Sequence, residues 1–147
     1  PHKPSAQQCV IDLDETDHAT HLGVFAQDDE PWGVSLKRHA GVLVGVCSLF
    51  DQPCIRCKVP WEDHEALRLR VMGTLPEVRG LGAGAALIAG ASDEVLRRGK
   101  TVLWCDAREV AFGFYERLGF DFMNEVYELP DVGPHRTMAL VLSSPRN

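Results

Sequence analysis

The chain has 147 residues, 45% of them apolar, so it can bury the core of one domain of ordinary size. Its formal net charge is −6 and it has no run rich in Lys or Arg, which disfavours nucleic acid as a partner. No apolar stretch is long enough to span a bilayer and no signal peptide is recognisable, so we expect a cytoplasmic protein without a membrane partner.

Three strands are predicted in the first half of the chain. Residues 1–20 are polar and predict an irregular segment that precedes one domain over residues 21–147. Residues 21–26 and the valine-rich residues 40–49 predict a hairpin of two strands. In residues 67–74 apolar side chains alternate with Arg and Met side chains, which predicts a half-buried third strand.

Two helices are predicted in the second half. From Gly80 onward apolar residues recur at helical spacing, and Gly99 suits the position just after a helix end. Asp106 is the predicted cap of the second helix, because Glu109 lies three residues later, as in a capping box. This second helix is expected to stop at Gly119.

The remaining strands complete the expected fold. Residues 101–105 are an unbroken apolar run, which predicts a buried strand between the two helices. Residues 120–129 and 136–142 predict the two last strands. The order strand-strand-strand-helix-strand-helix-strand-strand predicts the α/β class, with helices packed on a mixed sheet.

The cysteines are Cys9, Cys47, Cys54, Cys57 and Cys105. Their odd number and irregular spacing argue against a disulfide framework. Cys54-x-x-Cys57 matches half of a zinc or redox motif, but a structural zinc site takes four ligands, usually from two such pairs. We therefore expect free thiols in a reducing compartment and no metal ion.

The glycine-rich segment from Arg79 to Gly84 stands where a strand gives way to a helix. The amides and the dipole at a helix start attract phosphate, and glycines let it come close. The alternative is a tight turn whose small residues serve packing only. A nucleoside triphosphate is disfavoured because no Lys-Ser/Thr pair follows. A dinucleotide stays open, since Gly80-x-Gly82-x-x-Ala85 fits its fingerprint and Asp106 stands near the place of a ribose-binding acid.

Two blocks of sequence resemble the GNAT acetyltransferase superfamily. Arg79-Gly-Leu-Gly-Ala-Gly84 matches the R/Q-x-x-G-x-G/A signature of its pyrophosphate loop. Residues 108–120, REVAFGFYERLGF, resemble its second motif, N-x-x-A-x-x-F-Y-x-x-x-G-F. Together with their flanks, the blocks cover residues 67–122 at the family's separation. The segment NEVYELPDVGPHRTMAL resembles the last strands of small stand-alone members of the ElaA type, which extends the likeness to residue 142.

The resemblance implies a fold and a cosubstrate. The expected fold is a mixed sheet flanked by helices, in which two central parallel strands, residues 67–74 and 101–105, splay apart around acetyl-CoA. The backbone of the first strand would pair with the pantetheine arm like an added strand. The expected cofactor-binding residues are Met72, Gly73, Thr74, Arg79, Gly80, Leu81, Gly82, Ala83, Gly84 and Arg108.

The resemblance also implies a reaction. An acceptor amine of a small molecule or peptide would attack the thioester directly, and Tyr115 would be the general acid that protonates the leaving thiolate. Without the family context, Tyr115 is a core aromatic residue of an amphipathic helix. The alternative function is a non-catalytic acyl-CoA-binding or regulatory module of the same family. The resemblance further allows a homodimer that pairs through the last strands.

Two departures from the family pattern bear on the mechanism. Arg108 stands where the second motif usually has Asn, and its side chain either reaches the cofactor or faces solvent. Arg70 stands where many relatives carry a Glu that serves as general base. The candidates for a replacement base are His64, Glu65, Glu128 and His135. Arg68 and Arg70 share one strand face, which either favours an acceptor with a nearby carboxylate or is simply solvated.

Overall fold

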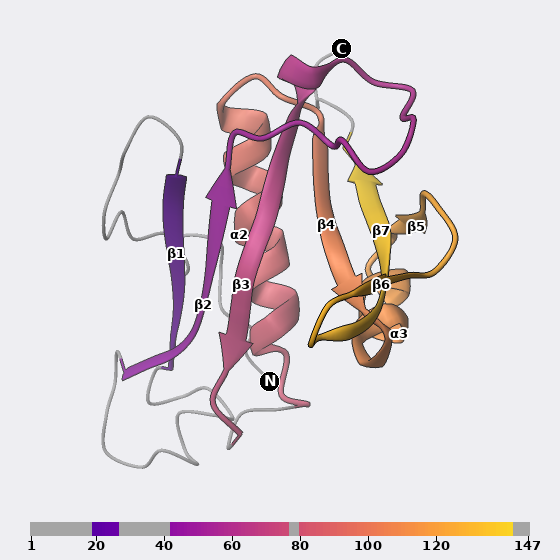
Figure 1. Cartoon of the computed structure of the whole chain (residues 1–147). Helices are drawn as coiled ribbons and strands as arrows, with labels where there is room; N and C mark the ends of the chain where they lie inside the picture. Colours follow the sequence, from indigo (N-terminus) through magenta and orange to yellow (C-terminus); the bar gives the residue numbers. More distant parts are fainter. Residues whose placement is uncertain (1–18, 27–41, 77–79, 143–147) are drawn as a thin grey trace.

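A computed structural model describes residues 19–26, 42–76 and 80–142 (Figure 1). The first strand, β1, begins at Ala19, two residues before the start that its sequence predicts, and the rest of the predicted irregular segment lies outside the described residues. The strands are β1 Ala19–Ala26, β2 Val42–Phe50, β3 Ala66–Thr74, β4 Val102–Arg108, β5 Asp121–Phe122, β6 Tyr127–Leu129 and β7 Gly133–Val141. The helices are α2 Ala83–Arg97 and α3 Phe112–Arg117, with short 3-10 turns at Asp63–Glu65 and Glu109–Ala111.

The described strands form one mixed sheet in the order β1-β2-β3-β4-β7-β5, with β6 also paired to β7. β3 and β4 are parallel, whereas the other neighbours are antiparallel. Helix α2, the crossover between β3 and β4, lies against one face of the sheet, and α3 lies beside the β4–β7 end (Figure 1). The predicted α/β fold with a mixed sheet is confirmed.

Helix α2 owes its position to one apolar face. Its fully buried residues include Ala83, Leu87, Ala91 and Val95, which follow one another at steps of four along the helix. They pack against the inward side chains of β1 to β4 in the main core cluster. Burying a side chain the size of Leu87 contributes about 1.5–3 kcal/mol, so this face fixes the helix on the sheet.

One charged residue is buried on the same helix. Glu94 is only 4% exposed, and its carboxylate accepts hydrogen bonds from Arg97 and Arg98 at 2.5–3.0 Å. Arg98 also donates to the hydroxyl of Thr20 in β1. Burial by itself would raise the pKa of Glu94, but the two guanidinium groups outweigh it and the net shift is downward. The cluster thus ties the end of α2 to the edge of the sheet.

A smaller core covers the opposite face of the sheet. Trp104 is 2% exposed and packs with Ala66, Ala139 and Cys54, the last of which comes from the segment after β2. The indole Nε1 of Trp104 donates to the carbonyl of Gln52 at 2.9 Å. This bond and the apolar contacts hold the segment of residues 51–62 against the sheet, close to the site described below.

Two predictions for the second half of the chain are wrong because of pairing with β7. Asp106 was the predicted helix cap, but it lies inside β4, because β7 extends that strand by pairing Asp106 with Thr137 and Arg108 with His135. The helical turn begins only at Glu109.

The predicted strand over residues 120–129 is two short strands. Phe122 pairs with Met138, while Tyr127 pairs with His135, so the segment between β5 and β6 has two residues more than β7 can match. The side chain of Asn124 takes the place of the missing backbone partner and accepts the Thr137 N–H at 2.8 Å. The segment therefore bends away from β7 between the two strands.

Candidate active site

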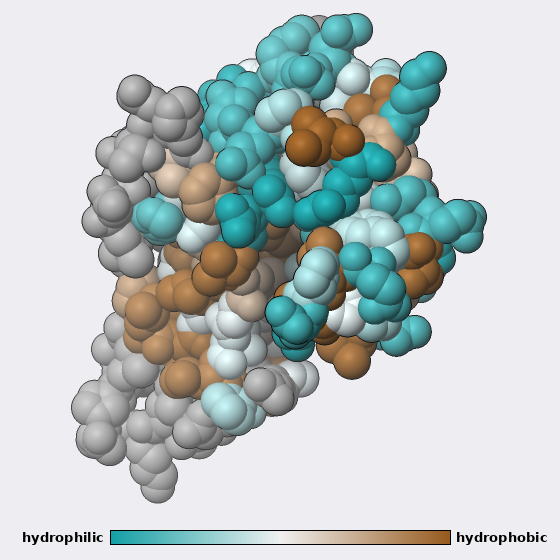
Figure 2. Space-filling view, viewed as in Figure 1, coloured by the Kyte–Doolittle hydropathy of each residue, from teal (hydrophilic) through white to brown (hydrophobic). Residues whose placement is uncertain are grey.

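The two parallel strands separate after three residue pairs. β3 and β4 pair from Ala66 opposite Val102 to Arg68 opposite Trp104, and beyond that point β3 pairs only with β2 and β4 only with β7. A cleft of about 470 Å³ opens between them, lined by fourteen residues of β3, β4, α3, β6, β7 and the 3-10 turn before α3. Figure 2 shows this hollow in the middle of the surface, in the view of Figure 1. The predicted splay of the central strands is thus present.

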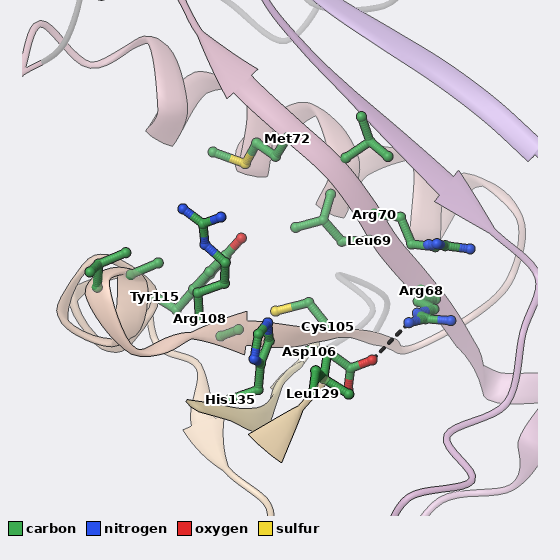
Figure 3. Close-up of a pocket in the computed structure, with 14 residues that line it drawn as sticks. Arg68, Leu69, Arg70, Met72, Cys105, Asp106, Arg108, Tyr115, Leu129 and His135 are labelled. Atoms are coloured by element: carbon green, nitrogen blue, oxygen red, sulfur yellow. Dashed lines mark hydrogen bonds and ion pairs between the residues drawn. The ribbon is translucent and has the colours of Figure 1, made fainter. Parts of the chain in front are cut away.

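A β-bulge bends β3 where the cleft begins. Val71 has φ of +54°, and the pairs Ser48–Arg70 and Val46–Gly73 leave Val71 and Met72 together opposite the single residue Cys47. A β-branched residue seldom adopts a left-handed conformation, which costs about 1–2 kcal/mol. The bulge lies three residues beyond the last β3–β4 pair, and Met72 points into the cleft (Figure 3).

The glycine-rich segment forms an open turn before α2. Gly80 and Gly82 have φ of +79° and +96°, a conformation that favours glycine, and a Cβ on either would have no neighbour within 4 Å. The helix itself starts at Ala83 with Gly82 as its cap, so the predicted start at Gly80 is three residues early. Amides of a first helical turn lack intrahelical partners, so this open turn fits a phosphate group. Arg79 lies outside the described residues.

Gly84 serves a different purpose from the other two glycines. A Cβ at this position would lie 3.1 Å from the Phe114 ring and 3.3 Å from the end of Met72. Gly84 therefore lets α2 approach α3 and the cleft wall closely. At Gly84 the small residue therefore serves packing, which is the alternative to phosphate binding. At Gly80 and Gly82 no neighbouring atom limits the size of the side chain.

Tyr115 is brought to the cleft by α3. Its ring is held by edge-to-face contacts with Phe114 and Phe120 at centroid distances of 5.1 and 5.0 Å. Burial, and then the adjacent Cys105 thiol, raise the pKa of the Tyr115 phenol well above its usual range. Burial and the charge of Asp106 raise the pKa of Cys105 to about 12. Both groups are therefore protonated at neutral pH, and Tyr115 can donate a hydrogen.

Asp106 is the centre of a charge network that the sequence analysis missed. Its carboxylate accepts from Arg68 at 2.7 Å, from Arg56 at 3.0 Å and from the Tyr127 hydroxyl at 2.6 Å, and its side chain is 7% exposed. A dinucleotide site would use the Asp106 carboxylate to bind a ribose hydroxyl. In this structure side chains of the protein already donate hydrogen bonds to that carboxylate. The sequence signal was present, since Asp106 follows Trp104 by two residues and so shares the strand face that carries Arg68.

The same network explains one of the two strand arginines. Arg68 is bound to Asp106 and lies over the Trp104 ring at 4.9 Å, so it is an internal ion-pair partner. Arg70 is exposed, lies 5.6 Å from the Phe50 ring and is among the residues that line the cleft. Arg108, also exposed, points into the cleft (Figure 3).

Of the four candidate bases, His135 alone lines the cleft. Its side chain is 4% exposed, and its Nδ1 lies 2.8 Å from the carbonyl oxygen of Gly133. His64 and Glu65 lie in the 3-10 turn that precedes β3, outside the cleft lining, and Glu128 borders a separate hollow beside β6. The cleft thus brings together Met72, Arg108, Tyr115 and His135, while Gly73, Thr74 and the glycine turn do not line this cavity.

The described residues contain no group of three or more His, Cys, Asp or Glu side chains placed to hold a metal ion. The Sγ atoms of Cys54 and Cys57 lie 3.9 Å apart, and both are free thiols. None of the described helices is both long and apolar enough to cross a membrane.

Solved structures share this fold. An aminoglycoside 6'-N-acetyltransferase, solved in complex with coenzyme A, superposes with a TM-score of 0.62 at 17% identity and covers 90% of this chain and 77% of its own. A GCN5-related N-acetyltransferase from Kribbella flavida superposes with a TM-score of 0.60 at 18% identity, over 89% of this chain and 72% of its own. At these identities the likeness concerns the fold.

Sequence comparison shows the family as well as the fold. The uncharacterized N-acetyltransferase YitI of Bacillus subtilis (strain 168) is 30% identical over 148 aligned positions, which cover 99% of this chain and 86% of YitI. The model of the acetyltransferase (GNAT) family matches residues 4–120, a span that includes the glycine turn, the splayed strands and Tyr115. The chain therefore belongs to the GNAT family of acetyltransferases.

Proposed function

We propose that this protein transfers the acetyl group of acetyl-CoA to an amine of a small molecule or peptide by direct attack of the amine on the thioester. The observation that carries the proposal is the separation of β3 from β4 after Arg68 and Trp104. It leaves the edge of β3 that faces β4 without a strand partner among the described residues, beside a cleft walled by Tyr115. An extended amide chain can add to such an edge.

The cosubstrate is held in two places under this proposal. The backbone of Met72, Gly73 and Thr74 pairs with the pantetheine arm, and a Cβ at Gly73 would meet nothing within 4 Å, so the approach is open. The turn from Arg79 to Gly84 holds the pyrophosphate with its amides. The side chain of Arg108, which points into the cleft, contacts the cofactor between these two places.

Tyr115 acts as the general acid. As the carbon–sulfur bond of the thioester breaks, its phenol donates a proton to the departing thiolate. The phenol carries its proton at neutral pH, as this role requires, although the raised pKa makes Tyr115 a weaker acid than an exposed phenol. A thiol with the ordinary pKa of about 8.5 already leaves readily, so the acid contributes only about 10²-fold.

Two measurements test the proposal. Acetyl-CoA is expected to shift the amide NMR signals of residues 80–84, and free thiol is expected to appear when an amine from an acceptor panel is added. Gly82→Ala should weaken binding, because φ of +96° is unfavourable for alanine at the phosphate turn. Gly99→Ala is the matched control, since it places the same strain at φ of +75° after the other end of α2.

The outcomes separate the candidate functions. Unmoved signals at millimolar coenzyme A would overturn the proposed site altogether. Clear binding without thiol release for any amine would instead favour the non-catalytic acyl-CoA-binding module. We keep the cytoplasm as the proposed location, because free cysteines such as Cys54 and Cys105 suit a reducing compartment.

A further inference from the structure

The proposed attack needs an acceptor amine that has lost its proton. An alkylammonium group has a pKa of about 10.4, so only about one molecule in 2,500 is uncharged at pH 7. A side chain that removes this proton in the site accelerates the reaction by about 10²–10⁴-fold. Arg70 stands where the family resemblance places a Glu base, and an arginine cannot accept this proton.

The cleft holds few groups that can act as a base. Its arginines keep their protons in proteins. Cys105 and Tyr115 have raised pKa values and are protonated. The Asp106 carboxylate is already occupied, because Arg56, Arg68 and Tyr127 all donate to it. These exclusions leave His135 among the titratable residues that line the cleft.

The hydrogen bond of His135 decides which ring nitrogen faces the substrate. A carbonyl oxygen only accepts, so the contact between Nδ1 and the Gly133 oxygen at 2.8 Å places the ring hydrogen on Nδ1. In the neutral ring, Nε2 then carries a lone pair. No described residue makes a hydrogen bond to Nε2, although the side chain is only 4% exposed. In Figure 3 the ring stands upright below Cys105 and Arg108 and faces the cleft.

The ring is held in this orientation before substrate arrives. The Tyr127 ring lies 6.1 Å from it at an interplanar angle of 30°, and the Tyr127 hydroxyl is fixed by Asp106. When Nε2 gains a proton, the bond from Nδ1 to Gly133 becomes charge-assisted and therefore stronger. The contact thus stabilises the protonated ring at the moment it forms.

We infer that Nε2 of His135 is the general base that deprotonates the acceptor ammonium in the proposed acetyl transfer, on which this inference rests. The ammonium N–H bond breaks and its proton passes to Nε2. The freed lone pair forms the carbon–nitrogen bond, and the carbon–sulfur bond breaks as the thiolate takes the Tyr115 proton. The second amine proton restores Tyr115, and the imidazolium releases its proton to solvent. One proton is released per acetyl group, so the step balances.

The experiment compares two acceptors that differ in amine basicity alone. An alkylamine found active in the panel is paired with its fluorinated analogue, whose amine is uncharged at pH 7. His135→Gln keeps a donor for Gly133 but has no basic nitrogen. We expect kcat/KM of this variant to fall about 10²-fold for the alkylamine and less than about threefold for the analogue.

Controls separate catalysis from structure. His64→Gln changes an exposed histidine outside the cleft and should leave both rates unchanged. Unchanged binding of acetyl-CoA to His135→Gln shows that the cofactor site is intact. An equal loss with both acceptors, or no loss with either, overturns the role of His135 while the acetyl transfer itself stands. Absence of transfer by the unaltered protein with every amine overturns the proposed function, and this inference with it.

A second measurement does not depend on a variant that folds. Nitrogen-15 NMR of the histidine side chains reports which ring nitrogen carries the hydrogen. We expect His135 to have its hydrogen on Nδ1, both free and with acetyl-CoA bound. A hydrogen on Nε2 in the neutral ring would leave no lone pair toward the cleft and would overturn the assignment.

Discussion

The two ends of the β3–β4 pair differ sharply in what their residues do. At the paired end, Ala66, Leu67, Val102 and Leu103 are at most 1% exposed, and the backbones of the two strands bond to each other. At the splayed end, beyond Arg68, the same strands present an unpaired edge to the cleft, and exposed residues such as Arg70 and Arg108 line it. One parallel pair thus belongs to the core at one end and to the candidate site at the other.

The contrast between the paired and the splayed end shows how two strands of a sheet can separate around a cleft. A buried backbone amide without a partner destabilises a fold, so a strand edge can stay unpaired only where water or a ligand reaches it. The bulge at Val71 lies in the splayed part of β3, and β7 pairs with the opposite edge of β4 along the whole of that strand. The paired end therefore carries stability, and the splayed end carries the proposed function.

The largest expected effect comes from breaking the paired end. Leu103→Ala removes a fully buried side chain and should lower the free energy of unfolding by about 2–5 kcal/mol, measured by denaturant titration. Val110→Ala, at an 86% exposed position on the cleft rim, is the stability control and should change it by less than about 0.5 kcal/mol. Similar losses for the two variants would contradict the division between core and site.

The next effect belongs to the splayed end. Tyr115→Phe keeps the ring contacts with Phe114 and Phe120 but removes the hydroxyl. We expect kcat to fall about 10²-fold with little change in acetyl-CoA affinity or melting temperature. The measurement is thiol release at saturating acceptor. A kcat within threefold of the unaltered protein would return Tyr115 to a purely structural role.

Alkaline pH should weaken the fold through Cys105, which lies where the strands begin to part. Its thiol ionises near pH 8.5–9 in the unfolded chain but only at about pH 12 in the folded protein. Between these values the unfolded state binds fewer protons, so the free energy of unfolding falls by up to about 1.4 kcal/mol per pH unit. Denaturant titrations from pH 8 to 10, in reductant, measure this slope.

Cys105→Ala serves as the control for the alkaline measurement. It removes the titrating group and should flatten the slope, with a remainder from Cys57, whose pKa burial and the neighbouring Cys54 raise to about 11. An unchanged slope in this variant would show that Cys105 is not the group responsible.

The smallest expected effect concerns the bulge itself. Val71→Gly relieves a left-handed conformation at an exposed β-branched residue, but glycine loses more backbone entropy on folding. The net result should be a stabilisation of about 0.5 kcal/mol. Val126→Gly changes an exposed valine without positive φ and should destabilise by about 0.5–1 kcal/mol. A loss in both variants would mean that Val71 is not strained.

Sequence patterns predicted most of the described elements because local periodicity reflects burial. β3 and α2 each start within three residues of their predicted start, since their alternating or helical spacing faces a single core. The errors at Asp106 and at residues 120–129 share one cause. The structure of both segments depends on pairing with β7, a strand that lies later in the chain. The local sequence pattern of a segment does not show which distant strand it will pair with.

The sequence alone determined the family, because its two motifs are short runs of neighbouring residues. From the same motifs it predicted a phosphate-binding turn at residues 79–84 and the role of Tyr115. Only the tertiary structure decided that Asp106 belongs to an internal charge network, that Arg68 serves it, and that His135 faces the cleft. These roles depend on distances between strands far apart in the chain. A carboxylate looks the same in sequence whether it caps a helix or neutralises two arginines, and its spatial neighbours make the difference.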